Sequence, residues 1–343
     1  MKTQYLFYSL ILFMFFSCNK ENPEPVIIDQ STENFSISTF FADNRENAIQ
    51  EFTVNTTDGT NTITGQNGTI LTFSENTFSD INGNLYSGNV KIEMIETQDK
   101  KDMLLMNRPT VANGGELLVS GGIVYVNVTT PGGSQLSIND NKPITARIPA
   151  TGFNNMDYFR GSEDLNGQFS WAEDPTMGVN TNTIVTDSTN GQEGFTFAYD
   201  FQIDSIGWIN CDYFGGWPDL TPVEIWLTDT ANVPDTTYNG NNTAVFVYYH
   251  SINSVGPAYS SGWTLNGVPM MGGVFFAYQS PVGENVSFIV ISEVTSGNYY
   301  YTIVPIPPTP LALTNNHIEY IPTSSMTGPV TMQNIQAMIA QLP

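Results

Sequence analysis

The strongest constraint on the fold is a two-residue alternation of hydrophobic and polar side chains. In residues 90–94, 124–128 and 223–227 every second residue is hydrophobic, which is typical of strands with one face on a core. Residues 244–249 and 288–291 are apolar on both faces and predict central strands of packed sheets. Asn-Gly, Asp-Gly and Gly-Gly pairs between such runs predict turns. The pattern therefore predicts an all-β fold of two β-sandwich-like domains in tandem.

Length and the C-terminal residues complete this organisation. The 343 residues exceed the size at which a single hydrophobic core usually stops growing. Met332, Ile335, Ile339 and Leu342 recur at helical spacing behind Thr331, a candidate cap, and predict one short C-terminal helix. The predicted parts are a signal peptide at 1–17, a polar tether at 18–34, a first β-sandwich domain at 35–160, a connecting segment at 161–194, and a second β-sandwich-like domain with the terminal helix at 195–343.

The start of the chain predicts export and lipidation. Lys2 precedes an apolar stretch from Leu6 to Phe16, which has the length of a signal-peptide core and is too short to span a membrane. The stretch ends in Ser17-Cys18, which resembles the lipobox of Bacteroidetes-type lipoproteins. This resemblance implies cleavage before Cys18, fatty acyl chains such as palmitate on that residue, and anchoring to the cell envelope, at the outer membrane. An ordinary signal followed by a core cysteine is the alternative.

Charge is distributed unevenly along the chain. The formal net charge is −23, and no Lys or Arg follows Arg160, whereas residues 161–343 contain 16 acidic residues. Nucleic acid, anionic membrane surfaces and acidic substrates are therefore poor partners for this half. The excess charge either serves solubility or attracts a cationic partner.

Residues 48–150 resemble a known family. The segments that carry the resemblance include 63–69, 73–78 and 88–93, and the stretch closes at Ser120-Gly121-Gly122. They are similar to an envelope-lipoprotein domain of Bacteroidetes, which in turn resembles the β-sandwich of ankyrins and netrin receptors. A further set matches the bacterial group: Phe159, Gly161, Trp171 and residues 207–212. The resemblance implies an interaction module. Self-cleavage at His-Phe-Ser, known in some relatives, is not implied, because that tripeptide is absent here.

No catalytic, cofactor-binding or metal-binding residue is predicted. The two histidines, His250 and His317, lie far apart in the sequence and are expected to be structural. Cys211 is expected to be a small buried hydrophobic residue. Asp80 begins a sequence that hints at a calcium loop, but its spacing favours a hairpin turn. The double glycines, such as Gly121-Gly122, are expected to be bulges or tight turns rather than phosphate-binding loops.

Three functions remain open. The first is a lipid-anchored, non-catalytic interaction or structural protein of the cell envelope, bound to the membrane through Cys18 and to an unidentified protein. The second is a carbohydrate-binding surface lipoprotein, since aromatic residues such as Trp226 and Tyr300 crowd the C-terminal half. The third is a hydrolase without a recognisable motif, because carboxylate pairs cannot be read from spacing alone.

Overall fold

The computed structural model describes residues 37–139, 141–150, 155–165, 167–186, 194–265, 268–305, 311 and 317–343. All of these residues belong to one compact unit. The predicted signal peptide, Cys18 and the tether at 18–34 lie outside the described residues.

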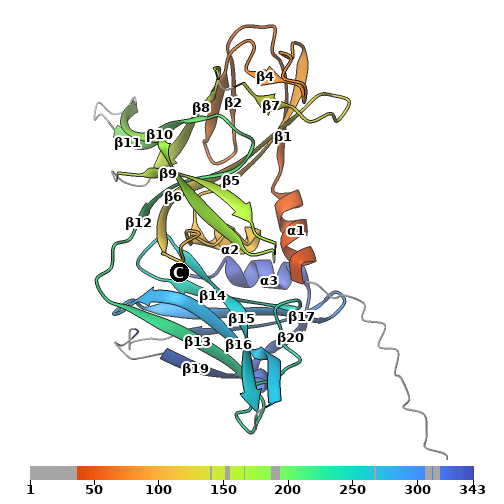
Figure 1. Ribbon diagram of the computed structural model, residues 1–343, viewed down its shortest axis with the longest axis vertical. Helices are drawn as coiled ribbons and strands as arrows, with labels where there is room; N and C mark the ends of the chain where they lie inside the picture. The colour runs from red at the N-terminus through yellow and green to blue at the C-terminus, as the bar shows by residue number, and fades with distance from the viewer. Residues whose placement is uncertain are drawn as a thin grey trace, which may run out of the picture. The chain divides into compact units, whose positions relative to one another are not determined.

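The first domain comprises the elements up to residue 214 (Figure 1). Its elements are α1 (Ile37–Asn47), β1 (Gln50–Asn55), β2 (Asn61–Thr64), β3 (Ile70–Phe73), β4 (Phe78–Ser79), β5 (Asn89–Thr97), α2 (Lys100–Met106), β6 (Leu118–Thr129), β7 (Ser137–Ile138), β8 (Ile144–Ala150), β9 (Asp157–Glu163), β10 (Phe169–Thr186), β11 (Gly194–Ile203) and β12 (Gly207–Phe214). Ten of these strands follow the order β1-β5-β6-β12-β9-β10-β11-β8-β3-β2, and β4 pairs separately with β7.

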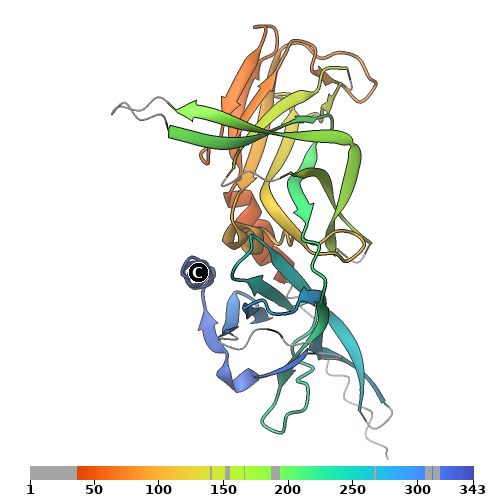
Figure 2. The same ribbon diagram turned by 90° about the vertical axis from the view of Figure 1, so that its left-hand side faces the viewer.

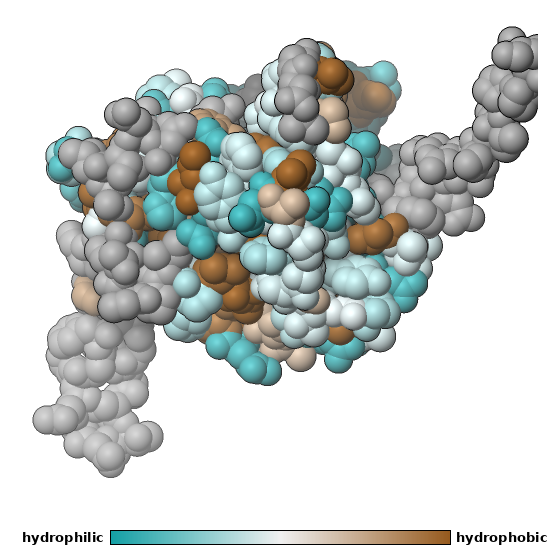
Figure 3. Space-filling model, turned by 90° about the horizontal axis from the view of Figure 1, so that it is seen from below, coloured by the Kyte–Doolittle hydropathy of each residue, from teal (hydrophilic) through white to brown (hydrophobic). Residues whose placement is uncertain are grey.

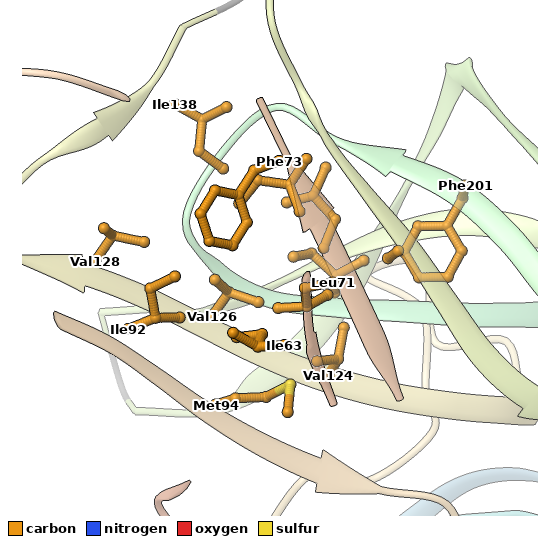
Figure 4. Close-up of a cluster of buried hydrophobic side chains, with 14 of the residues drawn as sticks. Ile63, Leu71, Phe73, Ile92, Met94, Val124, Val126, Val128, Ile138 and Phe201 are labelled. Carbon is orange, nitrogen blue, oxygen red and sulfur yellow. The ribbon is translucent and has the colours of Figure 1, made fainter. Parts of the chain in front are cut away.

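The long strand β10 connects the two layers of this domain. Its residues 169–178 pair with β9, and its residues 179–186 pair with β11. Side chains from both layers meet in one core, where Val124, Val126 and Ile92 of one layer face Leu71 and Phe201 of the other (Figure 4). The domain is therefore a β-sandwich, and the alternation of residues 90–94 and 124–128 places their hydrophobic side chains in its core as predicted.

The second domain is a single eight-stranded sheet with a terminal helix. Its elements are β13 (Leu220–Thr228), β14 (Thr243–Tyr249), β15 (Val255–Leu265), β16 (Val268–Pro281), β17 (Val286–Thr295), β18 (Asn298–Pro305), β19 (His317–Pro322), a 3-10 turn (Thr323–Ser325), β20 (Thr327–Val330) and α3 (Met332–Ile339). The strand order is β19-β13-β16-β15-β14-β17-β18-β20, and only the β13–β19 pair is parallel.

This sheet curls around its own core. Ile321 of β19, near one edge, belongs to the same hydrophobic cluster as Val247 of β14 and Phe288 of β17, and Val304 of β18 packs against that cluster. The central strands β14 and β17 are buried on both faces, as their continuous hydrophobic sequences predict. Their second face, with Phe246 and Ile289, looks toward the first domain.

The helices lie where the two domains meet (Figures 1 and 2). One hydrophobic cluster combines Phe40 and Phe41 of α1, Leu104 of α2, Ile335 of α3 and side chains of both domains. Hydrogen bonds reinforce this junction. The Lys100 ammonium donates to the backbone carbonyls of Tyr249 and His250, and the hydroxyls of Thr110 and Ser254 lie 2.7 Å apart.

The predicted C-terminal helix is confirmed. Thr331 caps α3, and its side chain and that of Asn334 bond reciprocally to each other's backbone N–H groups in a capping box. Ile335, Ile339 and Leu342 are buried, as their spacing predicts, and Met332 is half-buried against the same cluster. The all-β class with sandwich-like domains is confirmed as well.

Two features differ from the sequence-based expectation. The segment 161–194, predicted to connect the domains, is part of the first sandwich where it is described, because β9 and β10 pair as a hairpin and β12 returns between β6 and β9. The connection lies instead at residues 215–219. Helices α1 and α2 were not expected. Helix α2 has only seven residues, too few for a periodic pattern, and begins at the Asp99 cap, whose carboxylate accepts from the N–H groups of Lys101 and Asp102.

Candidate functional site

A short hairpin at residues 111–117 reaches from the first domain toward the second. Val111 and Leu117 pair across it, and Gly115 (φ +91°) allows its tight turn. Backbone hydrogen bonds between Trp171 and residues 111 and 113 hold the hairpin on β10. The Trp171 indole N–H donates to the carbonyl of Pro109 at 2.8 Å and holds the preceding segment. Trp171 therefore holds both the hairpin and the segment that precedes it.

A cleft of about 580 Å³ lies between this hairpin and the segment that connects the domains. Its lining is mostly hydrophobic or glycine: Gly114, Gly115, Glu116, Leu117, Phe214, Gly215, Gly216, Trp217 and Leu220. We call it the junction cleft. Its volume falls in the range of about 300–1,000 Å³ that is typical of ligand pockets, which favour domain boundaries.

The aromatic walls of the junction cleft are held in place. The Trp217 ring packs over Gly215, where a side-chain carbon would collide with the indole. The Phe214 ring meets the buried Phe159 ring edge-to-face at 5.5 Å, although Phe214 itself stays 40% exposed. Gly216 has φ +62°, a conformation that favours glycine. The cleft thus presents preformed aromatic surface to solvent.

A second, more polar pocket adjoins the junction cleft on the other side of the hairpin tip. It shares Gly114 and Gly115 with the cleft, and polar residues such as Asn113, Asp164, Gln168 and Ser170 contribute to its lining. The exposed Glu116 carboxylate lies over Gly114, at the rim of the cleft. The lining of the two pockets therefore contains carboxylates and no basic side chain.

The histidines are placed apart, and each has a polar neighbour. His250 Nε2 lies 2.9 Å from the Ser287 hydroxyl, and His317 Nε2 lies 3.4 Å from a Glu319 oxygen. Burial, with help from the Lys100 charge, lowers the pKa of His250, so this ring is neutral near pH 7. Within the described ranges, no group of three or more His, Cys, Asp or Glu side chains could hold a metal ion.

Cys211 is buried as expected, and its neighbour Asp212 is a buried carboxylic acid that the sequence did not reveal. Burial raises the pKa of the Cys211 thiol, which therefore stays protonated. Burial also raises the pKa of Asp212 to about 8. Asn210 donates to one Asp212 oxygen at 2.5 Å and accepts from the Ser120 hydroxyl. This network faces the second domain, where Asn253 donates to the Ser120 carbonyl.

The residues that carry the family resemblance in 159–171 and 207–212 come together around Gly161. A side-chain carbon at Gly161 would collide with Phe169, Trp171 and Trp208. The Arg108 guanidinium lies between the Phe169 and Trp208 rings, 4.1 and 4.5 Å from their centroids. These residues are buried or half-buried and form a packed junction rather than an open site.

Other predicted positions prove structural. The Asp80 carboxylate accepts from the N–H groups of Asn82 and Asn84, which makes a hairpin turn. Gly122 (φ +144°) lies at an irregularity in the β6–β12 pairing, as expected of a bulge.

Two aromatic rings, the half-buried Trp226 and the exposed Tyr320, lie on the outer face of β13 and β19. Trp226 and Tyr320 have ring centroids 5.5 Å apart with planes at 62°, and Trp226 Nε1 donates to Glu224 at 3.0 Å. Because the rings are not coplanar, the pair forms no flat platform for a sugar. On the face seen from below, hydrophobic residues form separate patches among polar ones (Figure 3).

The sequence pointed to only part of the junction cleft. Trp217 is one of the aromatic residues that crowd the C-terminal half, but nothing in the sequence pointed to Glu116, Leu117 or Phe214. The overlooked signal is a pair of glycine doublets, Gly114-Gly115 and Gly215-Gly216, which line the cleft from separate segments.

Comparisons with known proteins identify no relative. The sequence matches no family model, and no curated protein is significantly similar to it. The resemblance of residues 48–150 therefore stays a prediction. Among the described residues, no helix is both long and apolar enough to span a membrane.

Proposed function

We propose that this protein is a lipid-anchored, non-catalytic interaction module of the cell envelope, and that the junction cleft is its binding site. The observation that carries the proposal is the composition of the cleft: fixed aromatic and aliphatic walls with a single carboxylate, Glu116. Such a lining offers contact surface and lacks the nucleophile–base pair that a hydrolase needs. The predicted lipid on Cys18 supports the envelope location.

Anchoring is tested at Cys18. Replacing Cys18 by Ser removes the thiol that would carry the acyl chains, so the variant is expected in the soluble fraction or as unprocessed precursor. The wild type is expected in the membrane fraction, with acyl chains detectable by mass spectrometry of its N-terminal peptide. Unchanged membrane partition of the Cys18→Ser variant would contradict the anchor.

Binding at the junction cleft is tested by capture from envelope extract. A specific partner is expected with the wild type and with Trp226→Ala, whose indole lies on the outer face of β13. Capture is expected to be lost with Trp217→Ala, which removes one wall of the cleft. Partner recovery that is equal for all three proteins would rule out the cleft as the binding site.

Carbohydrate binding is the second candidate, because Trp226 and Tyr320 are accessible on one sheet face. In that case a glycan array would give signals that Trp226→Ala removes and Trp217→Ala leaves intact. The two variants therefore separate the candidates.

A further inference from the structure

We propose that the junction cleft binds an extended protein segment in which a hydrophobic side chain is followed, two residues later, by Lys or Arg. This inference rests on the proposed function and names the chemistry of the partner. The hydrophobic side chain would occupy the cleft beside Trp217, and the cation would lie near Glu116 and Asp164.

The lining changes in character across the hairpin tip. Leu117, Phe214 and Trp217 make one side apolar. The adjoining pocket is more polar, because Asn113, Asp164 and Gln168 line it beside apolar residues such as Val111. The two pockets meet at Gly114 and Gly115, which carry no side chain to separate them. A ligand that crosses this point must be apolar at one end and polar at the other.

The two pockets carry negative charge and suit a cationic ligand. The rim contributes the carboxylates of Glu116 and Asp164, and the connecting segment adds the exposed Asp219 nearby in sequence. No basic residue lines either pocket, and none follows Arg160 in the sequence. Clefts lined by charge of one sign concentrate ligands of the opposite sign. A cationic group therefore suits the polar pocket, and an anionic one is repelled.

An extended peptide presents side chains in pairs. Side chains two residues apart on an extended chain project to the same side, about 6–7 Å from each other. We expect such a pair to fill the two neighbouring pockets, which share Gly114 and Gly115. The preformed walls also reduce the entropy lost on binding.

Three synthetic peptides test the proposal by isothermal titration calorimetry on the compact unit of the protein, residues 34–343. The first repeats Leu-Ser-Lys-Ser, so that lysine follows leucine two residues later; the second replaces its lysines by glutamate, the third replaces its leucines by serine, and all have blocked ends. The leucine–lysine peptide is expected to bind at least about tenfold more tightly than either of the others. Raising the ionic strength from about 0.05 to about 0.5 M is expected to weaken it, because exposed charges are then screened.

Charge reversal at the rim is the sharpest variant. Glu116 is exposed, so Glu116→Arg is expected to fold normally. This variant should bind the leucine–lysine peptide about tenfold more weakly than the wild type does. The difference in affinity between the leucine–lysine and leucine–glutamate peptides should become smaller or reverse. Glu75→Arg, an exposed position between β3 and β4, is the matched control and should leave both affinities unchanged. Trp217→Ala should weaken every leucine-containing peptide without changing the preference between lysine and glutamate.

The outcomes separate this inference from the proposed function. If Trp217→Ala abolishes envelope capture but Glu116→Arg changes neither capture nor peptide preference, the junction cleft is the binding site. The proposal that its ligand carries Lys or Arg is then wrong. If Trp217→Ala leaves capture intact, the site itself fails. If dodecyltrimethylammonium displaces the peptide at a lower concentration than the peptide's own dissociation constant, a cationic amphiphile replaces the protein segment as the ligand.

Discussion

The two domains stabilise their strands with different polar chemistry. In the first, Arg147 donates two hydrogen bonds of 2.6 Å to Asp200 across β8 and β11, and Arg160 pairs with Asp174 and Asp204. The second domain has no Lys or Arg at all. Its strands are joined instead by neutral groups, such as Tyr249 with Ser280.

The difference shows that a domain without Lys or Arg can join its strands through neutral polar groups. The Tyr249–Ser280 and Thr243–Ser292 hydroxyl pairs are buried and span 2.8 and 2.9 Å. Short neutral hydrogen bonds carry no charge to desolvate, whereas the pairs of the first domain are partly exposed and gain little in water. The second domain therefore places neutral polar pairs inside, and all of its carboxylates except the buried Glu293 are at least partly exposed.

The domains also differ in how their cores are closed. The first core lies between two layers of its own strands. The second sheet curls around one core, but the other face of β14 and β17 is covered by the helices and the first domain. Because the second domain depends on the first for this cover, we expect the largest effect when the two domains are separated.

Residues 215–343 expressed alone are expected to aggregate or to unfold without a cooperative transition. Phe246, Tyr248, Ile289 and Ile291 would lose their cover, at about 1.5–3 kcal/mol for each side chain. Urea denaturation followed by tryptophan fluorescence measures this. Residues 37–214, which keep their own core, are the comparison and are expected to unfold cooperatively. A cooperative transition of the 215–343 fragment would instead support the independently folding domains predicted from the sequence.

The buried carboxylic acid of Asp212 predicts that the unfolding free energy depends on pH. The folded-state pKa of Asp212, about 8, lies above the ordinary value of 3.8, so the folded state holds the proton more tightly than the unfolded state does. The contribution of the Asp212 proton to stability is complete below about pH 4 and is lost as the pH rises to about 8. The unfolding free energy therefore falls by at most about 1.4 kcal/mol per pH unit in this range.

Asp212→Asn removes this titration, because the amide stays neutral. Its unfolding free energy is expected to fall less between pH 4 and 8 than that of the wild type. Chemical denaturation at several pH values measures the two slopes, and the exposed Asp58→Asn serves as control with an unchanged slope. Parallel curves for wild type and Asp212→Asn would mean that Asp212 does not titrate in this window.

The neutral pairs of the second domain are expected to matter individually. Ser280→Ala leaves the buried Tyr249 hydroxyl without its partner and should cost about 1–3 kcal/mol. The double variant Tyr249→Phe with Ser280→Ala removes both polar groups and should cost less than the two single effects combined. A double-mutant cycle from thermal unfolding gives the coupling, and strict additivity would show that the pair contributes nothing.

The charged pair of the first domain is expected to have the smallest effect. Arg147 is 43% exposed at its side chain, so Arg147→Gln should cost less than about 1 kcal/mol. The loss should shrink further in about 1 M salt, where the Debye length is about 3 Å. A larger cost than that of Ser280→Ala would invert the comparison between the domains.

The strands could be predicted from the sequence because their signal is local. Val90, Ile92 and Met94 show their core face by alternation alone, and Thr331 with Asn334 marks the start of α3. Helix α1 was missed although Ile37, Phe40, Phe41 and Asn44 are buried at helical spacing, because its polar residues make it only weakly amphipathic. Helix α2 was missed because its seven residues make about two turns, which are too few to show a periodic pattern.

The domain boundary and the junction cleft were decided by tertiary structure. Alternation shows which face of a strand is buried but not which sheet the strand joins. The sequence therefore did not predict that β10, β11 and β12 pair within the first sandwich. Glu116 and Trp217 are about a hundred residues apart in the chain and meet only because β12 ends beside the 111–117 hairpin. By itself, the sequence determined the strand faces, the terminal helix and the charge of each half. Which segments line one cleft depends on long-range pairing, for which no local side-chain pattern carries the information.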